Sequence, residues 1–323
     1  MSTSKYIKKV AIVGAGGNSG SYMAKELLKT GKHTVTAITR IDSTSKLPDG
    51  INIAKVDYND PVTIVEALKG QDALIVTLGV FAPPDTQAKL VQAAANAGVP
   101  WVLPNEWSPD TTNEGLLKDI APFQKLAEAR ELIKKLGKSS YIAVSTGFWY
   151  EWSLAIPAAF GFDFANRAVT FFDQGETKMG ISTWPQIGRA VAALLSMPVK
   201  PEDGDSDRCL ERFRNSQVYV NSFTVSQRDM LESVLRVTGT KESDWKITKE
   251  LAVTRYTEGL AAMQKGDREG FGRVMYSRVF FADDSGDFEK TKGTANEMLG
   301  LPKEDIDEAT RIAEERSKAD PWH

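Results

Sequence analysis

A glycine-rich segment near the start of the chain sets the strongest limit on its fold. The apolar run Lys9–Val13 leads into Gly14-Ala15-Gly16-Gly17-Asn18-Ser19-Gly20, and the amphipathic run Tyr22–Leu28 follows. A strand that turns through glycines into a helix directs the free N–H groups and the positive dipole end of the helix toward an anion. Glycines three apart permit the tight turn, the approach of a phosphate and close packing of the helix on the strand. We therefore predict a site for the diphosphate of a dinucleotide, with a ligand-free tight turn as the alternative. The residues assigned to it are Gly14, Gly16, Gly17, Asn18, Ser19 and Gly20.

Strands and helices then alternate along the first half of the chain. The pattern predicts strands at 33–39, 51–56, 73–78, 99–103 and 141–145, with helices at 62–69, 85–96 and 121–136. Asp60 is the predicted N-cap of the 62–69 helix and Pro61 its first residue. This alternation indicates an α/β fold, a doubly wound parallel sheet of the Rossmann type, whose ligands lie beyond the carboxyl ends of the strands. The loops at 14–20, 77–84, 104–112 and 146–152 open at this edge, so we also place Thr77, Leu78, Gly79, Gly147 and Phe148 beside the dinucleotide.

The second strand ends in Thr39-Arg40, twenty residues after Gly20. In dinucleotide folds an acid at this position binds the 2′-hydroxyl of NAD, whereas an arginine accommodates the 2′-phosphate of NADP. The next acid is Asp42, so we predict NADP(H) as the cofactor, with Arg40 binding its phosphate. A solvated arginine at a strand end is the alternative. Asp57 follows the third strand, where it would reach the adenine amino group or stabilise its own turn.

The regular alternation stops after Ser145, and an aromatic segment follows. Nine aromatic side chains fall between Phe148 and Phe172, which predicts the core of a second lobe. Those directly after the strand are expected to form a wall for a substrate. The assigned substrate-binding residues are Phe81, Glu106, Trp107, Trp149, Tyr150 and Trp152. We predict a dinucleotide-binding domain from residues 1–153 and 183–222, and a smaller, mostly helical substrate-binding lobe from residues 154–182 and 223–323. Residues 218–220 are predicted to form a seventh strand, and Ser226-Gln227-Arg228-Asp229 predicts a capping box for the next helix.

Composition excludes several classes of function. Forty lysines and arginines oppose 43 acids, leaving a net charge of −3 without a long run of either sign, so neither nucleic acid nor a membrane is an expected partner. A single cysteine, Cys209, excludes an internal disulfide and a thiolate zinc cluster. Two histidines, His33 and His323, argue against a Ser-His-Asp triad or a multi-histidine metal site. The start of the chain has no apolar signal segment, so we expect a cytoplasmic protein. We expect no metal, and either a monomer or a homodimer.

Five segments together carry a resemblance to a known family. They are the glycine segment at 14–20, Thr39-Arg40, Val56-Asp57-Tyr58-Asn59-Asp60-Pro61, Pro104-Asn105-Glu106-Trp107 and Ser145-Thr146-Gly147-Phe148. The chain resembles the isoflavone-reductase-like and NmrA-like atypical short-chain dehydrogenases, and most of all the fungal CipA-like proteins. The resemblance covers nearly all of residues 5–240 and fades in the C-terminal helices. It implies a lobe that binds NADPH, a smaller lobe that closes over a phenolic or other aromatic substrate, and hydride transfer between them.

The same resemblance raises the question of the proton donor. No tyrosine in the chain is followed four residues later by the lysine that short-chain dehydrogenases use. Isoflavone-reductase-like enzymes instead place a lysine in a Phe-x-x-Lys-x-x-x-Arg arrangement. Here Phe123 and Arg130 keep the frame, Leu126 stands at the lysine position, and Lys125 is one residue early, about 100° around a helix. The candidate catalytic residues are therefore Lys125, on a shifted helix, Tyr150, and Asn105, which would hold a substrate oxygen or, like Glu106, a water. A solvated helix lysine and a loop-organising asparagine are the alternatives for Lys125 and Asn105.

Two functions follow from these observations. The first is an NADPH-dependent reductase of an aromatic, phenolic or polyketide-like small molecule. The second is a non-catalytic, NADP(H)-sensing regulator that binds a protein partner, as NmrA-like proteins can, which the displaced lysine and the absent tyrosine-lysine pair favour.

Overall fold

The computed structural model describes residues 5–79, 82–201 and 208–319, and its first half alternates strands with helices. The elements up to the end of the sixth strand are β1 (Lys9–Val13), α1 (Asn18–Lys29), β2 (Thr34–Arg40), β3 (Asn52–Val56), α2 (Pro61–Leu68), β4 (Ala73–Val76), α3 (Thr86–Ala97), β5 (Trp101–Leu103), α4 (Glu114–Asp119), α5 (Ala121–Leu136) and β6 (Ser140–Ser145). Each strand and helix predicted in this region is present, with shifts of a few residues at some ends.

These strands form one parallel sheet of seven strands in the order β11-β6-β5-β4-β1-β2-β3. The last member, β11 (Ser216–Tyr219), returns from the second half of the chain and pairs with β6, which confirms the seventh strand. The strand order reverses between β1 and β4, and ligands of doubly wound sheets bind at such a reversal. The predicted fold class is confirmed.

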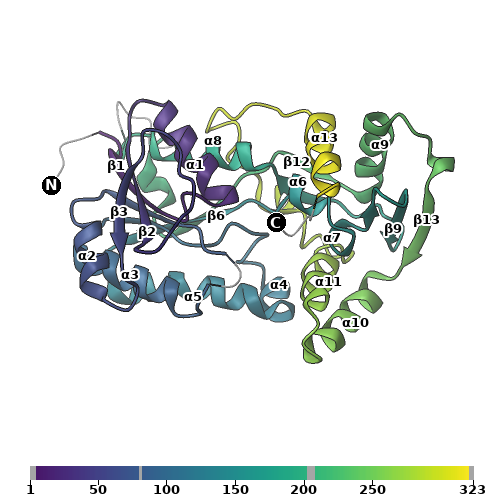
Figure 1. The fold of residues 1–323 in the computed structure, drawn as a ribbon, viewed down its shortest axis with the longest axis horizontal. Coiled ribbons are helices and arrows are strands. Elements are labelled where there is room, and N and C mark those ends of the chain that lie inside the picture. Colours follow the sequence, from purple (N-terminus) through teal and green to yellow (C-terminus); the bar gives the residue numbers. More distant parts are fainter. Residues whose placement is uncertain (1–4, 80–81, 202–207, 320–323) are drawn as a thin grey trace.

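Side chains of the strands alternate between two apolar layers. On β1, Val10 and Ile12 join the cluster under α1 and α8 (Trp184–Leu195), whereas Ala11 and Val13 join the cluster under α2, α3 and α5. Figure 1 shows α1 and α8 above the sheet and the other three helices below it. Burial on both faces explains why the central strands are continuously apolar in sequence.

The remaining elements lie mostly at the other end of the molecule and combine short strands with helices (Figure 1). They are β7 (Phe148–Trp149), α6 (Tyr150–Ser153), α7 (Pro157–Phe160), β8 (Phe162–Asp163), β9 (Ala168–Phe172), β10 (Met179–Ser182), η1 (Leu210–Phe213), β12 (Phe223–Val225), α9 (Gln227–Thr238), η2 (Glu242–Asp244), β13 (Lys246–Glu250), α10 (Ala252–Gln264), α11 (Arg268–Arg278), α12 (Phe288–Lys292) and α13 (Ile306–Ser317). Two three-stranded sheets, β12-β10-β7 and β13-β9-β8, belong to this part, which is therefore less purely helical than expected.

A separate apolar cluster forms the core of this C-terminal part. Five of the aromatic side chains of the 148–172 segment are essentially inaccessible within it: Tyr150, Phe160, Phe162, Phe171 and Phe172. Residues of α4 and α5 also pack against this cluster, so the core extends across the boundary that the sequence suggested. The division into two domains remains a prediction. Among the described helices, none is both long and apolar enough to span a membrane.

Local capping patterns identified in the sequence recur in the structure. Asp60 caps α2 by accepting a hydrogen bond from Val62 N at 3.0 Å, and Pro61 is the first helical residue. Ser226 and Asp229 form the reciprocal capping box of α9. Both patterns satisfy N–H groups that the first turn of a helix leaves free.

We expect Asp60→Ala to lower the free energy of unfolding by about 1 kcal/mol, because the variant loses the capping bond of α2. Urea unfolding measures this difference. Asp85→Ala is the matched control, since Asp85 also occupies an N-cap position, that of α3, but makes no side-chain capping bond there. Equal losses in the two variants would contradict the capping role.

Candidate functional site

The turn between β1 and α1 is held tightly against the end of β4. Gly14 has a φ of +81°, and a Cβ added there would lie 2.0 Å from the carbonyl oxygen of Thr77. A Cβ at Gly20 would lie 2.2 Å from the carbonyl oxygen of Gly14. Gly17 N donates to the same Gly14 oxygen at 2.9 Å, which closes the turn. These contacts place the amino end of α1 directly on the carboxyl edge of the sheet.

The outer side of this turn is open. Gly16, Gly17 and Asn18 are exposed, and the N-cap residue of α1 is Gly17, so no side chain caps the first N–H groups. The loop after β2 forms one wall, because a Cβ at Gly16 would lie 2.8 Å from the carbonyl oxygen of Lys46. A backbone cradle that excludes side chains and presents helix N–H groups fits the diphosphate of a dinucleotide.

Arg40 lies at the carboxyl end of β2, beside the same edge. Its side chain is 70% exposed, and its Nε lies 3.6 Å from the carboxylate of Asp42. An exposed surface pair of this length is weak and leaves the guanidinium available for a phosphate. Asp57 accepts a hydrogen bond from Asn59 N at 2.8 Å, so one carboxylate oxygen stabilises its own turn, as the alternative in the sequence analysis proposed.

The loop after β4 is fixed by Asn105. Thr77 donates through both its N and its Oγ1 to the carbonyl oxygen of Val13. The side-chain amide of Asn105 accepts from Leu78 N at 3.0 Å and donates to Leu78 O at 3.3 Å. Asn105 thus positions this loop, which was the alternative role, and a hydrogen bond from it to a substrate oxygen stays a prediction. Gly79 is exposed beside it, and Phe81 lies outside the described residues.

The structure corrects the candidate proton donors on α5 and α6. Lys125 is exposed, whereas Leu126 faces inward against the C-terminal apolar cluster, so α5 is not rotated to bring the lysine inward. Tyr150 is fully inaccessible, and its hydroxyl lies 2.7 Å from Thr310 Oγ1 of α13. Burial raises the pKa of Tyr150 far above its usual range. Neither group is placed to protonate a substrate.

Gly147 and Phe148 pack against the C-terminal part, and their contact with the dinucleotide stays a prediction. Gly147 has a φ of +66°, and a Cβ there would lie 1.9 Å from the carbonyl oxygen of Gly180 on β10. Phe148 is 7% exposed and stacks on Tyr276, with ring centroids 4.1 Å apart. These residues join the two parts of the chain through packing.

Trp107 and Glu106 are buried at the carboxyl end of β5. The indole Nε1 of Trp107 donates to Val76 O at 2.8 Å within the core under α1 and α8. Glu106 is inaccessible; its Oε2 accepts from Thr111 Oγ1 at 2.5 Å, and its Oε1 lies 3.4 Å from Arg130 Nε. Burial raises the pKa of Glu106 to about 7, against the lowering effects of Arg130 and Thr111. Both side chains are buried and bind groups within the chain, and their role in substrate binding stays a prediction.

Trp149 and Trp152 belong to a group that we call the tryptophan–arginine cluster: Trp149, Glu151, Trp152, Trp184 and Arg316. Trp149 points away from Phe148, as alternation along β7 requires, and packs with the core under α1 and α8, which also contains Ala15 of the glycine turn. Trp152 packs against both this core and the C-terminal one. Glu151, Trp184 and Arg316 were not assigned to a site from the sequence. The one sequence signal for Glu151 is that this carboxylate lies among aromatic residues, between Tyr150 and Trp152.

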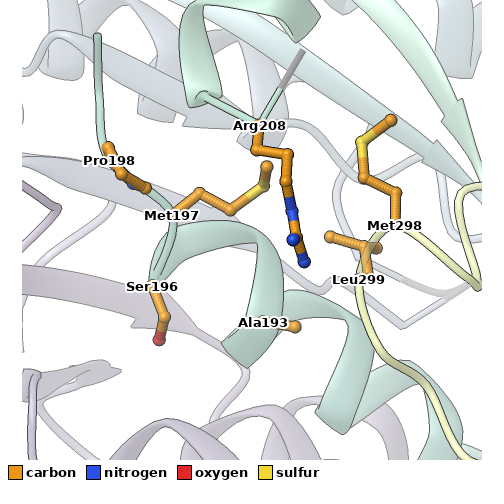
Figure 2. A pocket seen from close by; sticks show the side chains of 7 residues that line it. All are labelled: Ala193, Ser196, Met197, Pro198, Arg208, Met298 and Leu299. Atoms are coloured by element: carbon orange, nitrogen blue, oxygen red, sulfur yellow. The ribbon is translucent and has the colours of Figure 1, made fainter. Parts of the chain in front are cut away.

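Two surface pockets of the described chain lie elsewhere. Figure 2 shows one of about 310 Å³, with the side chain of Arg208 between those of Met197 and Met298. Its lining residue Pro198 pairs with Tyr6, just before β1, so this pocket lies near the start of β1. The glycine turn lies at the other end of that strand. A second pocket, of about 540 Å³, lies where α3 and α5 end. Both are thus separate from the glycine turn.

Comparisons with known proteins agree with this geometry. Residues 7–158 match the model of the NmrA-like family. Oxidoreductase aprR of Aspergillus flavus is 30% identical over 306 residues, which cover 93% of this chain and 96% of the relative. Quinone oxidoreductase 2 of Escherichia coli is 25% identical over 304 residues, covering 91% of this chain and 94% of the relative. The structure of AtPrR2 with NADP+ and (+)pinoresinol superimposes with a TM-score of 0.76 at 18% identity, covering 96% of this chain and 99% of that one, and so shares the fold.

The sheet, the glycine turn and these relatives define the class: the chain is an oxidoreductase with a Rossmann-type fold. It belongs to the NmrA-like family, as the resemblance noted in the sequence implied.

The buried carboxyl of Glu106 predicts a pH-dependent stability. Its pKa of about 7 in the folded chain, against an ordinary 4.5, means that the folded state holds a proton that the unfolded state has released. The free energy of unfolding should therefore fall by about 2.5 kcal/mol as the pH rises from 5 to 8 on account of this group.

Urea unfolding across this pH range tests the prediction, and Glu106→Gln should remove that share of the slope. Glu128→Gln, an exposed change on α5, should leave the slope as it is in the wild type. Glu151 contributes in all three proteins, so the difference between them isolates Glu106. A slope unchanged in Glu106→Gln would contradict the raised pKa.

Proposed function

We propose that the chain is an NADPH-dependent reductase of a flat aromatic small molecule that carries a conjugated carbonyl, as in a quinone or an enone. The observation that carries this proposal is the open amino end of α1 on the carboxyl edge of the sheet, with Arg40 exposed at the end of the adjacent strand β2. NADP(H), the cofactor expected from the sequence, is also the cofactor type in the structure of AtPrR2.

The residues present fit this cofactor. In the proposed arrangement, the first N–H groups of α1 bind the diphosphate, and Arg40 pairs with the 2′-phosphate. The segment Thr77–Gly79, fixed by Asn105, borders the other half of the dinucleotide. When bound, NADPH supplies the hydride. The chain contributes binding, orientation and the exclusion of water by the surrounding loops.

The position of the candidate acids favours a conjugated carbonyl over a simple ketone. Lys125 is exposed, Tyr150 is sealed in the core, and the Asn105 side chain is a neutral amide that already binds the backbone of Leu78. A reduced conjugated carbonyl leaves its charge on an enolate or phenolate oxygen with a pKa of roughly 10, which water protonates without a dedicated acid. An alkoxide from a simple ketone needs a positioned proton donor. The name of the E. coli relative, a quinone oxidoreductase, is consistent with this choice.

Cofactor preference gives the first test. We expect the wild type to bind NADPH at least ~10-fold more tightly than NADH, and Arg40→Gln to remove this difference by weakening NADPH alone. Isothermal titration calorimetry measures both affinities. Lys29→Gln, which removes an exposed charge at the far end of α1, is the matched control. Equal affinities of the wild type for the two nucleotides would overturn the role of Arg40.

Turnover gives the second test. We expect the purified protein to oxidise NADPH, followed at 340 nm, with 1,4-naphthoquinone or a chalcone enone, and at least ~100-fold more slowly with acetophenone, which lacks the conjugation to a second acceptor position. Tight NADPH binding without oxidation by any of these compounds would instead support the cofactor-sensing regulator. No binding of either nucleotide would contradict both functions.

A further inference from the structure

The tryptophan–arginine cluster brings together side chains from four elements. Trp184 opens α8, and its ring centroid lies 6.3 Å from that of Trp149 on β7 and 6.2 Å from that of Trp152 on α6. Arg316, near the end of α13, places its Cζ 4.4 Å from the Trp152 centroid and 5.2 Å from the Trp184 centroid. The guanidinium therefore lies over two indoles. A planar cation over aromatic rings is favourable on its own account.

This cluster concentrates buried polar atoms that lack a hydrogen-bond partner. Half of the ten such atoms found among the described residues belong to it: Trp149 Nε1, Trp184 Nε1, Glu151 Oε2, Arg316 Nε and Arg316 Nη2. Each buried unpaired group costs about 1–3 kcal/mol, and native structures hold few of them. Glu151 is only 2% exposed and Trp184 only 6%. Several unpaired groups in one place indicate a site whose partner comes from outside the chain.

The chemistry of these atoms defines the partner. Four of the five are N–H donors, so the site favours an acceptor. Nε and Nη2 of an arginine lie on one edge of the guanidinium and donate in parallel, which matches the two oxygens of a carboxylate. The indole faces beside them suit a flat ring. Glu151 does not supply this carboxylate, because its Oε1 accepts from Trp184 N at 2.8 Å and its Oε2 pairs with no described residue.

We propose that the tryptophan–arginine cluster recognises a carboxylate group attached to a flat aromatic ring. The proposal rests on the proposed function, since it names the part of the substrate that the chain would bind beside the cofactor. The location supports this link: Trp184 opens α8, which packs so closely on α1 that a Cβ added at Gly188 would lie 2.7 Å from the carbonyl oxygen of Tyr22. Trp152 packs against both apolar cores. In the structure the side chains are closed on one another, so entry requires the end of α13 to move.

Glu151 must be neutral when a carboxylate binds beside it. Burial and the nearby charge of Glu304 raise the pKa of Glu151 to about 7, against the effects of Trp184 N and of Arg316. Glu304 itself is paired with Arg189 of α8 and with Thr183 and Ser222. The protonated carboxyl can then donate from Oε2 to the ligand. Binding should weaken as the pH rises from 6 to 8, and Glu151→Gln should remove this dependence.

Isothermal titration calorimetry on the full chain without nucleotide tests the proposal, with 2-naphthoate as the probe and naphthalene-2-carboxamide as its neutral counterpart. We expect the wild type to bind the acid at least ~10-fold more tightly than the amide at pH 6.5. Arg316→Gln should abolish the difference. Arg311→Gln, an exposed change on the same helix, should preserve it.

Equal affinities for acid and amide, or no binding of 2-naphthoate to the wild type, would overturn the proposal. The wild-type comparison does not depend on whether Arg316→Gln folds. A preference for the acid that survives in a folded Arg316→Gln variant would also overturn it. Because no NADPH is present, this result is independent of the turnover test: binding of 2-naphthoate by a chain that oxidises no NADPH would refute the reductase and keep the carboxylate site.

Discussion

The close contact between Gly14 and Thr77 governs the arrangement of the whole carboxyl edge. Thr77 donates twice to Val13 O, which locks the ends of β1 and β4 together, and only a glycine at position 14 fits against the resulting surface. Gly20 then packs on Gly14 and draws the amino end of α1 to the edge of the sheet. The helix dipole and the free N–H groups are thereby directed at one place. A side chain at position 14 or 20 would push α1 away from this place.

Two neighbouring residues after β5 point their side chains in opposite directions, and each holds a different loop at that edge of the sheet. Asn105 holds the backbone of Leu78 on the side of the glycine turn. Glu106 points to the other side, toward Thr111 in the loop before α4 and toward Arg130 on α5. The contact of Asn105 with Leu78 joins neutral groups, so it fixes the loop without removing a charge from water. The contact of Glu106 buries a carboxyl, whose raised pKa is the consequence of its removal from water.

The C-terminal segment fastens the second part of the chain to the sheet. Gln186 Nε2 donates to Pro302 O at 2.9 Å, and Glu304 binds Arg189 and Thr183 at the start of α8. These bonds bring α13 against the elements that follow β6, so Thr310 seals the hydroxyl of Tyr150 and Arg316 covers Trp152. The same packing that excludes Tyr150 from the site thus creates the cluster in which Arg316 lies.

The sequence by itself determined the parallel sheet, the glycine turn, the caps of α2 and α9, and Arg40 at the end of β2. Each of these depends on residues close together in the chain, through strand and helix periodicity, glycine conformation and capping. Only the tertiary structure decided which way Tyr150, Phe148 and Lys125 face. The partners of the first two, Thr310 and Tyr276, lie more than a hundred residues away, and Lys125 is set outward because Leu126 packs on the distant C-terminal core. Side chains that lie between the sheet and the C-terminal part point in the direction that long-range packing allows, and a local sequence pattern does not contain that information.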